Sequence, residues 1–151
     1  HGKGIFKWPD GSKYEGDFEN GALSGYGELC WADKRKYTGN WKNNKMHGRG
    51  TFVWPDGKMY VGEYNMDKKH GNGIYYWNKD KYYDGYWFNS KQHGRGINYN
   101  NGVKKEVVYR YGRKVVDDST LKEEKNNIEK ENNQLRESRR RNSSVADVMK
   151  I

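Results

Sequence analysis

A strict internal period of 23 residues constrains the fold of this chain more than any other feature of its sequence. Each copy reads Tyr-x-Gly-x-aromatic, a polar loop, Gly-x-Gly, three residues, a Trp and then a turn. Three columns of rings recur in this way: Tyr14, Tyr37, Tyr60 and Tyr83; Phe18, Trp41, Tyr64 and Trp87; and Trp8, Trp31, Trp54 and Trp77. A chain that repeats one short unit so faithfully is expected to fold as a stack of equivalent units rather than around one central core.

Each copy contains two short stretches in which residue types alternate, separated by turn residues, and this pattern predicts a β-hairpin. In the first full copy, Tyr14, Gly16 and Phe18 share one face of a strand, while Glu15 and Asp17 share the other. The glycines that alternate with rings are expected to leave room for those rings. The predicted fold is therefore an all-β repeat ribbon, in which successive antiparallel hairpins stack into an elongated twisted sheet roughly 45–50 Å long.

The composition changes abruptly near residue 116, which divides the chain into two regions. All 19 glycines and all 23 aromatic residues lie before position 113. The net charge of +9 also lies in the first 116 residues, because the tail carries 8 basic and 8 acidic residues. We predict a repeat array over 1–116 (a half repeat at 1–13, full repeats at 14–36, 37–59, 60–82 and 83–105, a degenerate cap at 106–116) and a charged tail over 117–151, helical over about 120–141.

The repeated unit resembles the MORN (membrane occupation and recognition nexus) repeat. The matching segments are Tyr14–Phe18, Tyr37–Trp41, Tyr60–Tyr64 and Tyr83–Trp87, together with His47–Gly50, His70–Gly73 and His93–Gly96. The resemblance implies a non-enzymatic scaffold that works near membranes or the cytoskeleton and is sometimes appended to lipid-modifying or other enzymes. Asn98 and Asn100 replace the rings of the fourth copy, so we expect the array to end there and 106–116 to form an irregular cap.

The sequence indicates no catalytic residues, no metal site and no cofactor. His1, His47, His70 and His93 occupy the same slot of successive repeats, roughly 10 Å apart in a stacked ribbon, and so cannot share one zinc ion. We interpret them as structural. The single cysteine, Cys30, has no partner, and the chain shows neither a nucleophile–base–orienter set nor a phosphate-binding Gly-Lys-Ser/Thr loop.

Basic residues recur at fixed places in the repeat and form the first candidate binding surface. One column consists of Arg35, Lys58, Lys81 and Lys104, and a second of Lys45, Lys68 and Lys91. They are interpreted either as a solvated surface or as a dock for anionic phospholipid headgroups or an acidic partner, each Lys or Arg contributing about 1 kcal/mol near an anionic membrane. Nucleic acid is disfavoured as a partner, because the rings that could stack on bases are needed in the core.

The abundance of rings suggests a second candidate surface. A thin ribbon has two faces, and 23 aromatic residues are more than a narrow core requires. An exposed aromatic groove could accept a protein partner, as a helix or as an extended peptide. In the alternative interpretation, both faces are covered by the chain's own turns and tail. Weak homo-oligomer formation, with ribbons pairing end to end, is a further alternative.

The tail is predicted to be a helix with a sparse apolar stripe. Its apolar residues Leu121, Ile128 and Leu135 are spaced by seven and supply only one position of a heptad, whereas a stable coiled coil needs two. We therefore expect the helix to lie on the ribbon or to pair only weakly. The arginines at 139–141 precede Ser143 and Ser144, and this arrangement resembles a site for a basophilic kinase.

These observations predict a non-catalytic scaffold that binds a protein partner, an anionic membrane surface or both. We expect it in the cytoplasm, associated with a membrane or the cytoskeleton. The alternative is the regulatory or targeting region of a larger enzyme, such as a lipid or protein kinase. The chain begins with His1 rather than Met, so we expect it to be a piece of a longer protein.

Overall fold

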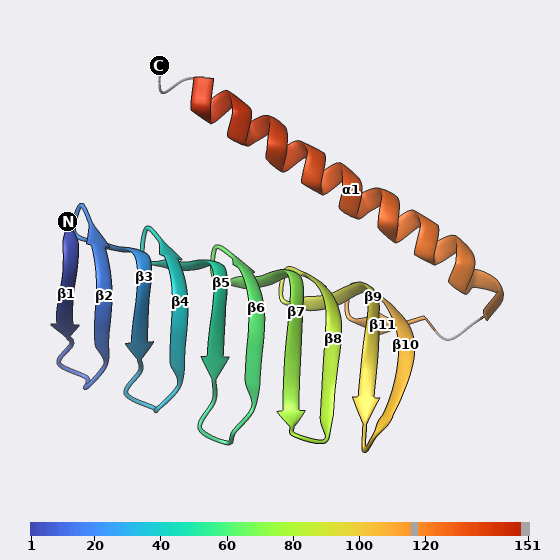
Figure 1. Cartoon of the computed structure of the whole chain (residues 1–151), viewed down its shortest axis with the longest axis horizontal. Helices are drawn as coiled ribbons and strands as arrows, with labels where there is room; N and C mark the ends of the chain where they lie inside the picture. Colours follow the sequence, from blue (N-terminus) through green and yellow to red (C-terminus); the bar gives the residue numbers. More distant parts are fainter. Residues whose placement is uncertain (116–117, 149–151) are drawn as a thin grey trace.

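The computed structural model describes residues 1–115 and 118–148, with side chains described over 1–115 and 123–142. These residues form one antiparallel sheet of eleven strands in chain order, followed by one helix (Figure 1). The elements are β1 (Gly2–Lys7), β2 (Lys13–Glu19), β3 (Ala22–Cys30), β4 (Lys36–Lys42), β5 (Lys45–Val53), β6 (Met59–Asn65), β7 (Lys68–Asn78), β8 (Lys81–Phe88), β9 (Lys91–Asn100), β10 (Val103–Arg110), β11 (Arg113–Lys114) and α1 (Asp118–Val148). The prediction of stacked antiparallel hairpins with a C-terminal helix is confirmed.

The two ends of the strands carry different turns. At the end where the repeated histidines lie, which we call the His end, the strands are joined by two-residue turns such as Asn43-Asn44, with φ angles of +46° and +67°. Such turns have the twist that antiparallel strands require, and Asn tolerates positive φ better than most residues. At the opposite end, the Trp end, the first three connections are longer, as in the segment 54–58, and the last two again have two residues. Figure 1 shows the His end at the top.

The buried core lies on one face of the sheet, which we call the ring face because it carries the four repeated tyrosines. Tyr14, Tyr37, Tyr60 and Tyr83 are all 0% exposed. Each tyrosine lies across two glycines of its own hairpin: a Cβ atom on Gly62 or Gly73 would overlap the Tyr60 hydroxyl. Larger residues at these two positions would therefore displace the ring from the sheet.

A β-bulge completes the tyrosine site. The register of β6 against β7 shifts between Gly62 and Tyr64, so Glu63 lies at an irregularity of the ladder. The Tyr60 hydroxyl donates a hydrogen bond of 2.8 Å to the carbonyl oxygen of Glu63. The same bond forms in the other full repeats, to the carbonyl oxygens of Asp17, Asn40 and Tyr86. The Tyr-x-Gly-x-aromatic pattern thus encodes a ring, a space for it and an acceptor for its hydroxyl.

Rings from successive repeats interlock along the ring face. The Tyr60 ring meets the Tyr64 ring of its own strand at a centroid distance of 5.1 Å and the Trp87 ring of the next repeat at 5.5 Å, both edge to face. The Trp87 indole N–H also donates to the carbonyl oxygen of Gly73 at 3.0 Å. A single hairpin would be marginally stable, so these contacts between neighbours are what stabilises the array.

The closing stretch is more regular than the predicted irregular cap. β10 pairs with β9 in continuous register from Val103 opposite Asn100 to Tyr109 opposite Gly94, and the short β11 extends the sheet. Val107 and Val108, 5% and 1% exposed, are buried on opposite faces. The alternation that makes a strand therefore continues here although the Tyr-x-Gly signature has ended.

The helix α1 is longer than predicted, because it runs from Asp118 to Val148 rather than from about 120 to 141. The segment 117–151 contains no Gly or Pro that would stop a helix at Arg141. Of the two arrangements considered for the tail, the structure has the helix lying on the ribbon, against β9 and β10. From there it runs back beyond the His end of the strands, in the direction of the N-terminal strands (Figure 1). We call the face it contacts, opposite the ring face, the helix face.

Candidate binding surfaces

The ring face is hollowed near its N-terminal end. The hollow has a volume of about 630 Å³. Its lining is mostly apolar and consists of Phe6, Trp8, Phe18, Gly21, Leu23, Leu29, Trp31, Trp41, Asn44, Met46 and Asp67. Several of these rings remain partly accessible, and Phe6 is 48% exposed. The sequence predicted an aromatic groove without placing it; the structure puts it beside the first three hairpins.

A lysine follows the hollow along the same face. Leu23, Met46 and Lys69 occupy the same place in successive repeats, and the first two line the hollow. The Lys69 ammonium lies 5.5 to 5.7 Å from the centroids of four rings, which belong to Trp54, Tyr60, Tyr75 and Trp87. Partial burial lowers the pKa of Lys69. Neither of the predicted basic columns contains this residue.

The two predicted basic columns lie at opposite ends of the strands. At the Trp end, Arg35 and Lys58 stand just before strands, Lys81 begins one and Lys104 is the second residue of another. Lys45, Lys68 and Lys91 begin strands at the His end. A seven-residue strand spans roughly 20 Å or more, so the two columns do not merge into one basic patch.

Acidic turn residues offset part of the Trp-end column. Arg35 pairs with Asp33 at 2.7 Å and Lys58 with Asp56 at 3.1 Å. The pKa of Asp56 is lowered, first by the backbone amide of Lys58 and then by its ammonium group. No acidic side chain of the described residues lies within 4 Å of the Lys45, Lys68 or Lys91 ammonium groups at the His end.

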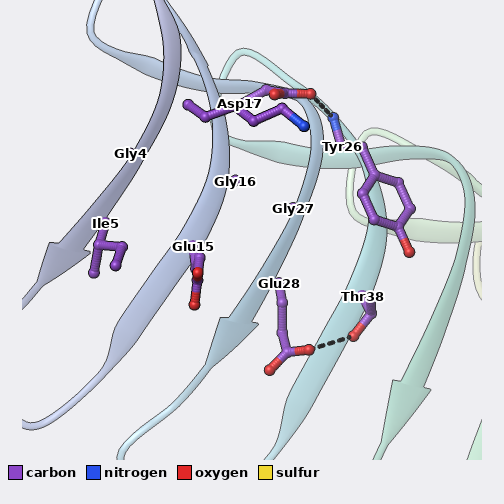
Figure 2. Close-up of a pocket in the computed structure, with 10 residues that line it drawn as sticks. Gly4, Ile5, Glu15, Gly16, Asp17, Tyr26, Gly27, Glu28 and Thr38 are labelled. Carbon is purple, nitrogen blue, oxygen red and sulfur yellow. Dashed lines mark hydrogen bonds between the residues drawn. The ribbon is translucent and has the colours of Figure 1, made fainter.

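The helix face has its own hollow at the N-terminal end, of about 680 Å³. Glu15, Asp17 and Glu28 line it from β2 and β3 (Figure 2). The Asp17 carboxylate accepts the Tyr26 amide at 2.9 Å, and the Glu28 carboxylate accepts the Thr38 hydroxyl at 3.3 Å. Lys3 lines the hollow as well, so three carboxylates against one ammonium leave this lining net acidic, although the chain as a whole is basic.

At its C-terminal end the helix face is covered by α1. Ile128 is 2% exposed and packs over Gly94, where an added Cβ would lie 3.1 Å from the Ile128 Cγ2 atom. Arg110 bonds Glu124 at 2.6 Å and Glu131 at 3.5 Å. Arg95 faces Glu129 at 3.7 Å and His93 faces Glu131 at 3.5 Å. An apolar contact, two arginines and His93 of the sheet thus hold the acidic side of the helix.

The repeated histidines lie on the helix face, and His47 and His93 take part in its hydrogen bonding. The Nδ1 atom of His47 accepts the Met66 amide at 3.2 Å, and that of His93 accepts the Tyr111 amide at 3.1 Å. His70 is 5% exposed, and neither of its ring nitrogens has a hydrogen-bond partner among the described residues. Burial lowers the pKa of His70 to about 4. The His47 and His93 rings are held neutral by these bonds, because an accepting Nδ1 cannot carry a proton.

Several further predictions concern sites that the structure addresses only in part. Within residues 1–115 and 118–148, no three His, Cys, Asp or Glu side chains gather into a metal-binding group. In the same part of the chain, no helix combines the length and apolar character needed to cross a membrane. The predicted phosphorylation sites, Ser143 and Ser144, fall outside the described side chains.

Comparison with known proteins agrees with the geometry. The family model of the MORN repeat matches residues 1–13, 14–34, 37–59, 60–80 and 83–97, which is more than half of the chain. Over 28 residues the chain is 61% identical to Alsin from Homo sapiens, Mus musculus and Rattus norvegicus. That stretch covers 18% of this chain and 2% of each relative, so the match spans only a small part of their length. The repeat and the sheet it forms together show that the chain belongs to the MORN repeat family.

Proposed function

We propose that this chain is a non-catalytic scaffold that holds a protein partner on its ring face, in the cytoplasm at a membrane or along the cytoskeleton. The observation that carries the proposal is the apolar hollow of about 630 Å³ on that face. The chain's own helix lies on the opposite face, against β9 and β10, and none of its side chains over 123–142 lines the hollow. MORN repeats are generally non-catalytic, which favours a binding role.

The chemistry of the hollow fits a peptide with apolar side chains. Partly exposed rings gathered on one face are typical of protein interfaces, and Trp supplies much binding energy when a partner covers it. Trp8 and Trp31 are half-buried at the wall, so a bound side chain would remove the rest of their surface from water. Each apolar side chain buried in this way contributes about 1.5–3 kcal/mol.

A peptide selection tests this proposal. Random dodecapeptides displayed on phage are selected on the intact chain, and the affinity of the winning peptides is then measured by fluorescence anisotropy. We expect Met46→Glu, which places a charge in the hollow, to weaken binding at least 10-fold. Tyr26→Glu is the matched control, since Tyr26 is 59% exposed on the helix face. Failure to select any peptide, or equal effects of the two variants, would contradict the proposal.

Binding to an anionic membrane is the second candidate, and it is favoured by the His-end lysines. Lys45, Lys68 and Lys91 are exposed, and no carboxylate of the described residues lies within 4 Å of them. Co-sedimentation with phosphatidylserine vesicles compares two triple variants, one with these lysines changed to Gln and one with Lys58, Lys81 and Lys104 changed to Gln. We expect the first to lose more binding; a native chain that stays in the supernatant at physiological salt excludes this candidate.

The same surfaces would serve the regulatory or targeting region of a larger enzyme, such as a lipid or protein kinase. The chain matches only 2% of the length of the relatives it resembles, so a larger whole is consistent with the comparisons. Sequencing of the full-length transcript tests this alternative. A catalytic domain in the same reading frame would support it, and a transcript that encodes only repeats and the tail would exclude it.

A further inference from the structure

Three equivalent positions of successive repeats differ in chemistry on the ring face. The backbone amides of Leu23, Met46 and Lys69 each donate a hydrogen bond to a turn side chain of the following repeat. The acceptors are Asn44 Oδ1 at 2.9 Å, Asp67 Oδ1 at 2.8 Å and Ser90 Oγ at 3.1 Å. The three backbones are therefore held in the same way, while the side chains are two apolar groups and one cation.

The cation is poorly compensated where it lies. The Lys69 ammonium is surrounded by four rings at 5.5 to 5.7 Å, and no carboxylate of the described residues lies within 4 Å of it. The faces of the rings attract the charge but replace only part of the hydration that the ammonium loses. Leucine or methionine fills the equivalent place in the two preceding repeats without this penalty. A lysine here is therefore disfavoured for folding and calls for another explanation.

The position of Lys69 supplies that explanation. Met46 and Asp67 form the end of the hollow nearest to Lys69, and the Asp67 carboxylate is already engaged by the Met46 amide. The Lys69 ammonium thus lies one repeat beyond the apolar hollow of the ring face, which is open to solvent. A carboxylate brought in by a ligand would find an unpaired ammonium in surroundings that screen it less than water does.

We infer that Lys69 is the anion-recognition point of the ring face, and that the peptide held there carries an Asp or Glu side chain beside apolar residues. This inference rests on the proposed peptide-binding function and specifies its ligand. One repeat rises roughly 10 Å, a distance that an extended peptide spans in about three residues. The expected pattern is therefore an apolar residue that enters the hollow and an acid about three positions away that reaches Lys69.

The experiment compares selections of random dodecapeptides on the intact wild-type chain, on Lys69→Met and on the matched control Lys68→Met. Lys68 is the adjacent residue, is exposed, and loses the same charge. We expect the wild type and Lys68→Met to enrich Asp or Glu next to Leu, Phe or Trp, and Lys69→Met to enrich apolar residues alone. For a selected peptide, changing its acid to the amide should weaken binding at least 10-fold on the wild type and less than 2-fold on Lys69→Met.

Thermal unfolding separates this role from a structural one. We expect Lys69→Met to raise the melting temperature, because it removes a poorly solvated charge and restores the residue found one repeat earlier. A lysine retained for packing would give a lower melting temperature instead. Apolar peptides without acids selected by the wild type, or an acid preference that survives in Lys69→Met, would overturn the inference and leave the proposed function standing. A wild type that selects no peptide would overturn both.

Discussion

The two faces of the sheet use the same repeat in different ways. On the ring face the residue is constant: a tyrosine stands at 14, 37, 60 and 83, and each is fully buried. On the helix face the residue at the bulge changes from repeat to repeat, from Asp17 through Asn40 and Glu63 to Tyr86. The constant tyrosines determine the fold, and the variable residues at the bulge determine which contacts each repeat offers on the helix face.

The helix α1 illustrates the difference. It docks where the helix face offers Tyr86 and Val108, which are 8% and 1% exposed, together with two arginines and a histidine that meet its glutamates. At the N-terminal end the same face is lined by Glu15, Asp17 and Glu28, which would repel the glutamates that α1 turns towards the sheet. A repeat protein can thus keep one backbone and assign different partners to its two ends.

The largest effect is expected from removing a constant ring. Tyr60→Ala deletes a fully buried side chain and leaves two glycines facing a cavity, so we expect a loss of about 3–5 kcal/mol in the free energy of unfolding. Tyr26→Ala on the helix face, where the ring is 59% exposed, should change it by less than about 0.5 kcal/mol. Urea unfolding followed by tryptophan fluorescence measures both. Similar losses would remove the distinction between the two faces.

The second effect concerns the docked helix. Ile128→Ala should destabilise the contact between α1 and the sheet by about 2–4 kcal/mol, because Ile128 is the buried apolar anchor of the helix. The sheet should stay folded, since its core lies on the other face. Hydrogen exchange by mass spectrometry should therefore show faster exchange in 123–142 and unchanged exchange in β3 to β6. The exposed Asn126→Ala is the control, and faster exchange across the whole sheet would contradict the prediction.

The third effect is a pH dependence of the helix face. Burial lowers the pKa of His70 from 6.5 to about 4, so the unfolded chain binds a proton in a pH range in which the folded chain does not. Stability is present above pH 6.5 and falls as the pH drops towards 4, by about 2 kcal/mol between pH 7 and pH 5 from this residue alone. His70→Phe should flatten that slope in thermal unfolding. A slope identical to that of the wild type would show that His70 does not titrate as described.

The smallest effect isolates one hydrogen bond of the ring face. Tyr60→Phe keeps the ring and removes the hydroxyl that donates to the Glu63 carbonyl, so we expect a loss of about 1 kcal/mol. Tyr82→Phe is the matched change on the helix face, where Tyr82 stacks on Tyr99 at a centroid distance of 4.6 Å. We expect a change below about 0.5 kcal/mol there. Equal losses of unfolding free energy for Tyr60→Phe and Tyr82→Phe would mean that the hydrogen bond to the Glu63 carbonyl does not stabilise the fold.

The regular part of the fold could be predicted from the sequence because the same pattern of rings and glycines occurs in four full repeats. A tyrosine, a glycine and a second ring at fixed spacing predict a strand, its buried face and the room for the ring. The bulge was not predicted, because Asp17, Asn40, Glu63 and Tyr86 share no chemistry. What these residues share is a backbone carbonyl group that accepts the tyrosine hydroxyl. Every residue type has such a group, so its role cannot be recognised from the sequence.

The binding surfaces were harder to predict for the same reason. The basic columns attracted attention because they recur, yet Lys69 stands in a column that otherwise reads Leu23, Met46 and Gln92. Arg110, which holds two glutamates of α1, lies in the closing stretch, where there is no earlier copy to compare with. The sequence did contain one signal for Lys69, namely a charged residue at a position that is apolar in the two preceding repeats. The meaning of that departure becomes clear only when the rings around the lysine are known.

The direction of the ladder has a mechanical consequence. Hydrogen bonds between strands run along the length of this sheet, so a pull on its two ends is carried by the repeats in series and the weakest joint yields first. Trp41 and Trp87 each fasten their joint with an indole N–H bond to the preceding hairpin, at 3.1 and 3.0 Å. Tyr64 supplies a ring without that donor at the joint between them. Among the three joints between full repeats, this central one should therefore open first under tension.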